Sequence, residues 1–294
     1  MKQAHWIFWS ALAFCMPGAH ADDLRCEPPN AAGHQRCLHP DGSSVERAFT
    51  TDGRRAAVLL RRWADGTLAE LRCAPASLLP GDREVCGHAG HTSDVTLYRQ
   101  PGQALGTVSY RQGVLQQQTI VNPQGAIVRS ESFVDLPGDA DRRVKRVYYP
   151  SGQLRHEIDL IERDPALHQG REGTGREFAE NGQLTQEVVW VGGREQRVRQ
   201  WYLNGQLKLD QQIRRLGRDE LRETRSFQDN GQPAALNRER NGRLFGWQRY
   251  HAPGGALMRE DEHGERGVLL RRKHYDAQGR LLREERVTED DSRV

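Results

Sequence analysis

One short pattern recurs through most of this 294-residue chain and limits what it can fold into. It reads aromatic residue, three residues, glycine, any residue and usually leucine, as in "FAENGQL" (178–184). Its clear copies follow one another every 23 to 30 residues. Self-similarity at such a period predicts a row of stacked repeats rather than an ordinary globular core. Further copies are "YYPSGQL" (148–154), "WYLNGQL" (201–207), "FQDNGQP" (227–233), "YDAQGRL" (275–281) and, with one extra glycine, "YHAPGGAL" (250–257).

The glycine of each copy predicts a tight turn. Glycine tolerates positive φ, so Asn-Gly, Ser-Gly and Gln-Gly favour a short hairpin connection. We expect the repeat aromatic and the leucine to face each other across this turn as a cross-strand pair. The predicted turn glycines are Gly152, Gly182, Gly205, Gly231, Gly254 and Gly279. The predicted repeat aromatics are Tyr148, Phe178, Trp201, Phe227, Tyr250 and Tyr275.

The residues around the turns alternate with period 2, which indicates strands. Leu154, Ile158 and Leu160 share one side, whereas Glu157 and Asp159 lie opposite. A hairpin with one weakly apolar face is too thin to be stable alone, so like units must stack side by side. The low apolar content of 36% and the mean hydropathy of −0.80 agree with this. We therefore predict an all-β fold, an array of stacked antiparallel β-hairpin repeats that form an extended sheet.

The chain begins with the features of a secretory signal peptide. Lys2 precedes an apolar run from Trp6 to Met16, and the small-x-small triplet 19–21 predicts cleavage between Ala21 and Asp22. The run is shorter than the roughly 20 residues that span a bilayer, so no integral membrane segment is expected after cleavage. An alternative is lipidation of Cys15, but Phe14 stands where lipoprotein signals favour a small residue. The sequence predicts a periplasmic or secreted protein.

Four cysteines remain after this cleavage, all of them before residue 90. An even number in an exported chain predicts two disulfides. Of the three possible connectivities we favour the sequence-local one, Cys26–Cys37 and Cys73–Cys86. Residues 22–95 are then a disulfide-stapled N-terminal β cap, residues 96–287 the repeats, and residues 288–294 a polar tail.

The charge balance argues against nucleic acid as a partner. Removing residues 1–21 takes away Lys2 and no acidic residue, which leaves 42 basic and 40 acidic side chains. Affinity for a phosphate backbone needs a concentrated excess of Lys and Arg. Basic runs such as "RRVKR" (142–146) and "LLRRK" (269–273) are interpreted as solvated strand faces.

The sequence contains no motif that predicts catalysis or a cofactor. There is no Gly-x-Ser-x-Gly elbow, a disulfide-bonded cysteine is no nucleophile, and "GREGTG" (170–175) lacks the ending of a phosphate loop. The best metal candidate is Cys86 with His88 and His91, with Cys73 as a fourth ligand. Because Cys86 is expected in a disulfide, we predict no metal, no cofactor and no enzymatic activity.

The repeats carry a family resemblance. "NGRLFGWQRYHAPGG" (241–255) and "HGERGVLLRRKHYDAQGRLLRE" (263–284) resemble MORN repeats in the bacterial variant of YwqK-type proteins, which are regarded as antitoxins. The resemblance covers roughly residues 96–287 and is best from 146 onward, although the repeat spacing wanders between 23 and 30 residues. "YDAQGRL" also resembles a YD repeat of the Rhs family, which ranks second.

This resemblance implies a MORN-like sheet that binds another protein. An extended sheet offers a broad, stiff surface without a deep cleft, which suits recognition better than turnover. We therefore expect a periplasmic immunity protein or antitoxin that neutralises a toxin or effector by stoichiometric masking. The alternative is an envelope scaffold that organises a membrane, cell-wall or protein assembly.

Overall fold

The computed structural model of this protein is all-β, which confirms the predicted fold class. It describes residues 24–30, 33–49, 56–73, 85–87, 92–136, 140–162 and 172–287. The predicted signal peptide with its cleavage site, Cys15 and the polar tail lie outside these residues. Within them the strands are β1 Arg25–Cys26, β2 His34–Leu38, β3 Ser44–Phe49, β4 Ala56–Arg62, β5 Leu68–Cys73, β6 Thr92–Gln100, β7 Gln103–Arg111, β8 Val114–Val121, β9 Ile127–Leu136, β10 Ala140–Tyr148, β11 Leu154–Glu162, β12 Glu172–Phe178, β13 Leu184–Val191, β14 Arg194–Trp201, β15 Leu207–Leu216, β16 Asp219–Phe227, β17 Pro233–Arg240, β18 Arg243–Leu244, β19 Gly246–His251, β20 Leu257–His263, β21 Leu269–Tyr275 and β22 Leu281–Arg286.

The chain divides into two compact units. The first comprises residues 1–103 with 111–114, and the second comprises residues 104–110 with 115–294. Strand β6, which contains the boundary predicted at 95/96, belongs to the first unit. The two units are described separately below.

The first unit contains an antiparallel sheet of strands β1 to β5 in chain order. The structure pairs the cysteines in the sequence-local way, Cys26 with Cys37 and Cys73 with Cys86. The first disulfide joins the directly opposed residues of β1 and β2. Both disulfides indicate an oxidising, extracytoplasmic environment for the protein. The buried apolar side chains of this unit are Cys37, Val45, Val58, Leu68, Leu71 and Cys86.

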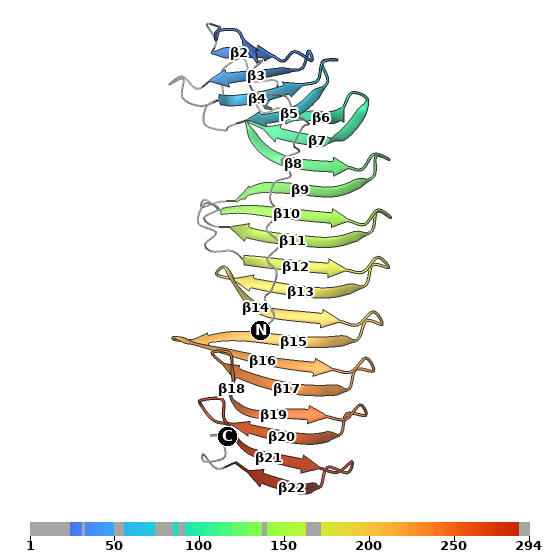
Figure 1. Cartoon of the computed structure of the whole chain (residues 1–294), viewed down its shortest axis with the longest axis vertical. Helices are drawn as coiled ribbons and strands as arrows, with labels where there is room; N and C mark the ends of the chain where they lie inside the picture. The colour runs from blue at the N-terminus through green and yellow to red at the C-terminus, as the bar shows by residue number, and fades with distance from the viewer. Residues whose placement is uncertain are drawn as a thin grey trace. The chain divides into compact units, whose positions relative to one another are not determined.

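The second unit is a single extended sheet in which each hairpin stacks on the next. From β8 to β17 every strand pairs antiparallel with its successor in the chain. Strand β17 then pairs with both the short β18 and β19, and consecutive pairing continues from β19 to β22. Figure 1 shows these strands following one another in chain order, as the repeat predicts.

The repeat motif forms the same turn in successive hairpins. In the β10–β11 hairpin, the Gly152 amide donates to the Tyr149 carbonyl at 2.9 Å, and the Tyr149 amide donates to the Gln153 carbonyl at 2.8 Å. Gly152 has φ +86°, and the register shifts by one residue at Tyr148. This is the three-residue hairpin loop in which a left-handed glycine forms a bulge. The repeat aromatic Tyr148 directly faces Leu154, as expected.

One repeat differs from the sequence-based alignment. In "YHAPGGAL" the left-handed residue is Gly255, with φ +83°, and not the predicted Gly254. His251, and not the predicted Tyr250, faces Leu257 in the register position of the repeat aromatic. The turn needs its left-handed residue four positions after the last paired residue of the strand. The second glycine therefore belongs to the common frame, and the unit contains no insertion.

The second unit has little apolar core. Its buried apolar side chains are Val108, Tyr110, Leu160, Val188 and Ile213, whereas Glu131, Glu187, Asp210, Gln248 and Asp261 are buried polar residues. Much of the stability of this sheet must therefore come from main-chain hydrogen bonds and from contacts between polar side chains, because buried polar groups need partners.

Candidate protein-binding surface

Charged side chains of opposite sign alternate along one row of the second-unit sheet. The register places Arg146, Glu157, Arg176, Glu187 and Arg199 opposite one another on the successive strands β10 to β14. Arg146 Nε lies 2.7 Å from a Glu157 carboxylate oxygen, and Arg176 Nε lies 3.1 Å from Glu187. Arg199 binds the other Glu187 oxygen. Each carboxylate is thus shared by the two neighbouring strands.

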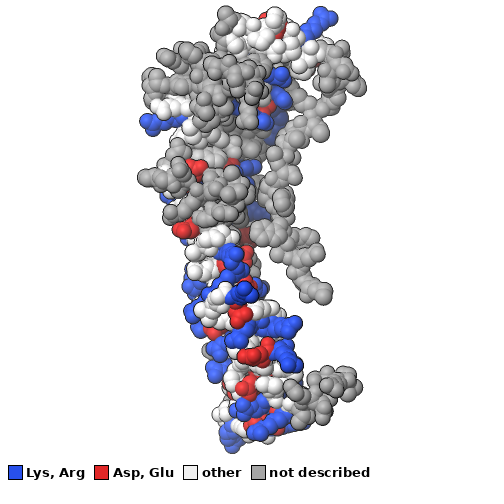
Figure 2. Space-filling view, turned by 90° about the vertical axis from the view of Figure 1, so that its left-hand side faces the viewer, with Lys and Arg blue, Asp and Glu red and all other residues white. Residues whose placement is uncertain are grey.

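This row exists because side chains alternate between the two faces of a strand. A residue of each strand meets the equivalent residue of the next only when the turns hold a constant register. An isolated exposed ion pair contributes about 0–1 kcal/mol, and the connection of several pairs into one row is what makes a measurable contribution to stability expected here. In Figure 2, basic and acidic side chains lie intermingled along the described strands.

Glu131 on β9 is the most completely buried carboxylate among the described residues, with 0% of its side chain exposed. It accepts hydrogen bonds from Gln118 at 2.7 Å, from Arg129 at 3.1 Å and from Arg143. Burial by itself raises the pKa of Glu131, but these donors and the two positive charges outweigh it and lower the pKa. The carboxylate is therefore ionised at neutral pH.

The surface is hollowed over strands β15 to β17. The hollow has a volume of about 360 Å³. We call it the arginine hollow, and it is lined by Gln212, Arg214, Leu221, Arg222, Glu223, Arg225, Arg238 and Glu239.

Strand alternation distinguishes the residues that line the arginine hollow. Arg222 and Glu239 face each other, and each is next in sequence to a residue of the pair Glu223 and Arg238. Because side chains alternate along a strand, those of Arg222 and Glu239 point to the opposite face of the sheet. The remaining charged residues on the hollow face are three arginines and one glutamate, Arg214, Arg225, Arg238 and Glu223.

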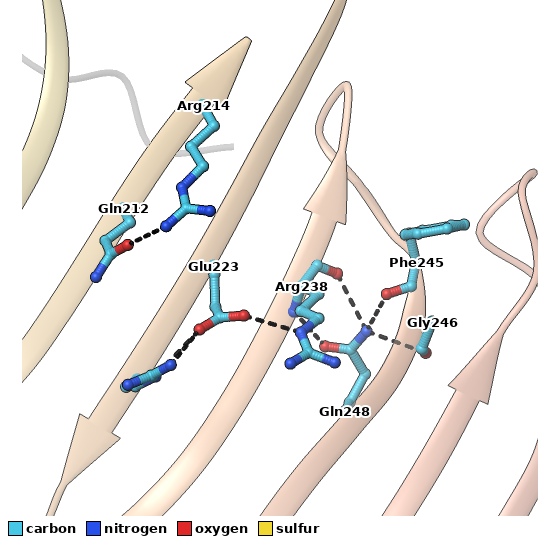
Figure 3. Close-up of polar contacts among 8 residues, drawn as sticks. Gln212, Arg214, Glu223, Arg238, Phe245, Gly246 and Gln248 are labelled. Atoms are coloured by element: carbon cyan, nitrogen blue, oxygen red, sulfur yellow. Dashed lines mark hydrogen bonds and ion pairs between the residues drawn. The ribbon is translucent and has the colours of Figure 1, made fainter. Parts of the chain in front are cut away.

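Glu223 is the centre of the polar contacts in the arginine hollow (Figure 3). Arg225 donates from Nε and Nη2 to the same Glu223 oxygen, at 3.1 and 2.7 Å. Arg238 Nε donates to the other oxygen at 2.9 Å. Burial opposes ionisation of Glu223, but the hydrogen bonds and positive charges of Arg238 and Arg225 outweigh it and lower its pKa.

Gln248 holds the backbone of the strand that carries Arg238. Its side chain is fully buried. Its Oε1 accepts from the Arg238 amide at 2.6 Å, and its Nε2 donates to the Arg238, Phe245 and Gly246 carbonyls at 3.1, 3.0 and 3.3 Å. The short excursion at β18 opens the pairing of β17 with β19, and Gln248 supplies the hydrogen bonds that the open ladder would leave unmade (Figure 3).

Arg214 has a different environment from the other two arginines. Its Nη2 donates to Gln212 Oε1 at 3.2 Å, and its side chain is exposed. Within the described residues no carboxylate pairs with Arg214, whereas Arg225 and Arg238 both bind Glu223. The arginine hollow therefore carries an uncompensated cation.

The repeat aromatics predicted from the sequence take part in packing. Phe178, Trp201 and Tyr275 face Leu184, Leu207 and Leu281 in the same register as Tyr148, and Phe227 faces Pro233. All are half-buried. The residue after the repeat aromatic joins neighbouring hairpins, since Tyr149 donates to the Phe178 carbonyl and Tyr202 to the Phe227 carbonyl, both at 2.9 Å.

The described part of "GREGTG" lies in a strand and forms no phosphate loop. Gly173 and Gly175 belong to β12, and Gly173 faces Trp190 on β13. The indole ring covers Gly175 so closely that an added Cβ would lie 2.6 Å from it. An aromatic side chain over strand glycines replaces packing that the glycines cannot provide.

The two cysteines of the candidate metal site provide no thiol ligands. Cys73 and Cys86 are joined to each other, and His88 and His91 lie outside the described residues. Among the residues that the structure does describe, no group of three or more potential metal ligands is present. The same part of the chain holds no helix of the length and hydropathy that crossing a bilayer demands.

Sequence reasoning missed the arginine hollow. The segments that form it, "QQIRRL" (211–216), "RETRSF" (222–227) and "LNRER" (236–240), are individually ordinary polar strands. Aligning them on the turn glycines Gly217 and Gly231 would have brought their arginines together, because the turn fixes the register. Gln248 gives no such signal, since its role depends on the excursion at β18.

Comparisons with known proteins find solved structures of low identity and a short match to one family model. Similar solved structures include TcdB2–TccC3–TEV, with 10% identity over 90% of this chain and 16% of that chain and a TM-score of 0.21. Another is TcdB2–TccC3 without the hypervariable C-terminal region, with 9% identity, coverage of 84% and 17%, and a TM-score of 0.22. The chain spans less than a fifth of these chains, and the overall likeness is weak.

No curated protein matches the sequence. The family model of the MORN repeat variant matches residues 171–191, which include the hairpin of β12 and β13. This chain is therefore a repeat protein that contains a segment similar to a MORN repeat variant.

Proposed function

We propose that this chain is an exported protein-binding repeat protein that acts as a periplasmic immunity protein. It neutralises a toxin by covering the toxin's active surface in a stoichiometric complex, without turnover of its own. This proposal includes the YwqK-type assignment and the cleavable signal peptide at residues 1–21.

The observation that carries the proposal is the polar face of the second-unit sheet. Rows of paired Arg and Glu side chains on stacked strands form a stiff surface with fixed positions of charge. Such surfaces favour protein recognition, because complementary charges fix the register of two partners and suppress wrong ones. The arginine hollow is lined almost entirely by polar and charged side chains, which supports binding of a partner's polar side chain rather than of a mostly apolar small substrate.

The two disulfides support the exported location. Both are expected to persist only in an oxidising compartment. A toxin delivered into the periplasm would meet the protein there, before it reaches its target.

The test is a titration of toxin activity. The mature protein, residues 22–294, is co-expressed with secreted proteins encoded next to it, and the complex is isolated by size-exclusion chromatography with light scattering. A complex of fixed stoichiometry, and inhibition that is complete at that ratio, would support masking. Inhibition at far lower ratios would indicate turnover and contradict the proposal.

The same preparation tests the envelope scaffold. Retention of the mature protein on purified cell wall or on vesicles, with no complex with any co-expressed toxin, would favour the scaffold and reject the immunity function.

A further inference from the structure

We propose that the arginine hollow is the contact site for the partner, and that the partner places acidic side chains of a protein segment there. This inference rests on the proposed function, since it assumes that the ligand of the sheet is a protein. It commits to aspartate or glutamate side chains as the groups recognised.

The first argument is the charge of the hollow face. Arg214, Arg225 and Arg238 stand against the single carboxylate of Glu223. Elsewhere in the sheet, Glu187 and Asp261 each lie within ion-pair distance of two arginines and are nearly covered by them. Glu223 likewise binds two arginines, Arg225 and Arg238, so the cation in excess is Arg214, and a carboxylate of a partner would complete the pattern.

The second argument is that two of the three cations are held in position before binding. Glu223 binds Nε of both Arg225 and Arg238, and Gln248 fixes the backbone of Arg238. Nη1 and Nη2 of Arg238 make no hydrogen bond within the described residues, so this edge of the guanidinium can donate two parallel bonds to a carboxylate. Arg214 is held only by Gln212 and can turn toward the same ligand.

The third argument concerns which anion fits. A continuous polyanion would bring many phosphates against Glu223 and against the carboxylates of the neighbouring rows, such as Asp210. A protein segment brings only a few charges and also apolar atoms. Leu221 lies half-buried in the hollow and offers these atoms a surface. The hollow therefore favours carboxylates on a protein segment over a phosphate polymer.

The experiment uses two fluorescent peptides with the mature protein. One peptide carries two Glu-Glu pairs between glycines, and the other has glutamine in place of each glutamate. We expect the glutamate peptide to bind, to bind more weakly as salt is raised, and to exceed the glutamine peptide. We expect Arg214→Gln to weaken binding at least about fivefold, because a charge-assisted hydrogen bond is lost.

Arg266→Gln is the matched control. Arg266 is an exposed arginine in the turn between β20 and β21, outside the hollow. The substitution removes the same charge as Arg214→Gln but outside the hollow. Binding should therefore stay within about twofold of the wild type if general charge attraction contributes little. Thermal unfolding of both variants should match the wild type, since neither arginine has a carboxylate partner within the described residues.

Three outcomes would overturn the inference. These are equal binding of both peptides, equal weakening by Arg214→Gln and Arg266→Gln, or stronger binding to inorganic phosphate or to anionic phosphatidylglycerol vesicles than to the glutamate peptide. The toxin complex separates this inference from the proposed function. If Arg214→Gln still forms the complex with wild-type affinity, masking stands and the hollow is not the contact. If the wild type forms no complex, the proposed function itself fails.

Discussion

Substituting Gly255 by alanine tests the turn frame that generates the whole array. Gly255 has φ +83°, and an alanine held in this left-handed region costs about 1–2 kcal/mol. The added Cβ would also lie 2.5 Å from Gln232 Oε1 and 3.3 Å from Gln232 Cβ. Because Oε1 is the mobile end of its side chain, moving it costs about 0.5–1.5 kcal/mol, the range for a strained rotamer.

The expected loss of stability is therefore about 2 kcal/mol. For a unit of this size that lowers Tm by about 4–8 °C. Thermal and urea unfolding followed by circular dichroism measure this loss. Hydrogen exchange of residues 250–257 shows whether the opening begins at the turn.

Gly254→Ala is the matched control, because Gly254 lies outside the left-handed region and an added Cβ meets nothing within 4 Å. It should change stability by less than about 0.5 kcal/mol, or increase it slightly by restricting the unfolded chain. In the double variant Gly255→Ala with Gln232→Ala, only the steric part of the loss should disappear. Equal destabilisation by Gly254→Ala and Gly255→Ala would refute the common frame.

Three further predictions concern the polar and aromatic contacts. The contacts of Glu131 hold its pKa below the ordinary 4.5, so the folded state binds fewer protons than the unfolded state. Tm should therefore be constant near neutral pH and fall as the pH drops below about 4.5. Glu131→Gln should flatten this dependence of Tm on pH. Trp190→Ala uncovers Gly175 and should destabilise the second unit by about 1–3 kcal/mol in urea unfolding, whereas a phenylalanine there should restore much of the loss. Gln248→Leu leaves the amide and carbonyl of Arg238 without their hydrogen-bond partner, so it should lower the free energy of unfolding by about 2–4 kcal/mol and speed hydrogen exchange at Arg238. A loss below about 0.5 kcal/mol would contradict the role given to Gln248.

The repeat unit itself was predictable because its causes are local. A glycine four residues after Tyr148 and two before Leu154 determines a hairpin, and period-2 alternation determines its strands. The all-β array follows from the requirement that such thin units stack. The short separation of Cys26 and Cys37 in the sequence favoured their pairing. The structure has this pairing, because the two residues face each other on the adjacent strands β1 and β2.

The alignment of one repeat was wrong for an equally physical reason. The sequence offered Tyr250 and Gly254 as members of the common frame, since an aromatic residue there looks like the others. The structure uses His251 and Gly255, because the turn conserves the distance from the last paired residue to the left-handed glycine. Backbone geometry, and not the type of side chain, decides which residue enters the frame.

The sequence by itself determined the hairpin, its turn and the stacking of like units, because these depend on residues within about a dozen positions of one another. Only the tertiary structure decided which charges meet. Arg146, Glu157 and Arg176 become neighbours through the register of three strands, and Arg214, Glu223 and Arg238 line one hollow through the register of β15, β16 and β17. Register adds up over successive turns, and a shift of one residue would exchange the two faces of a strand.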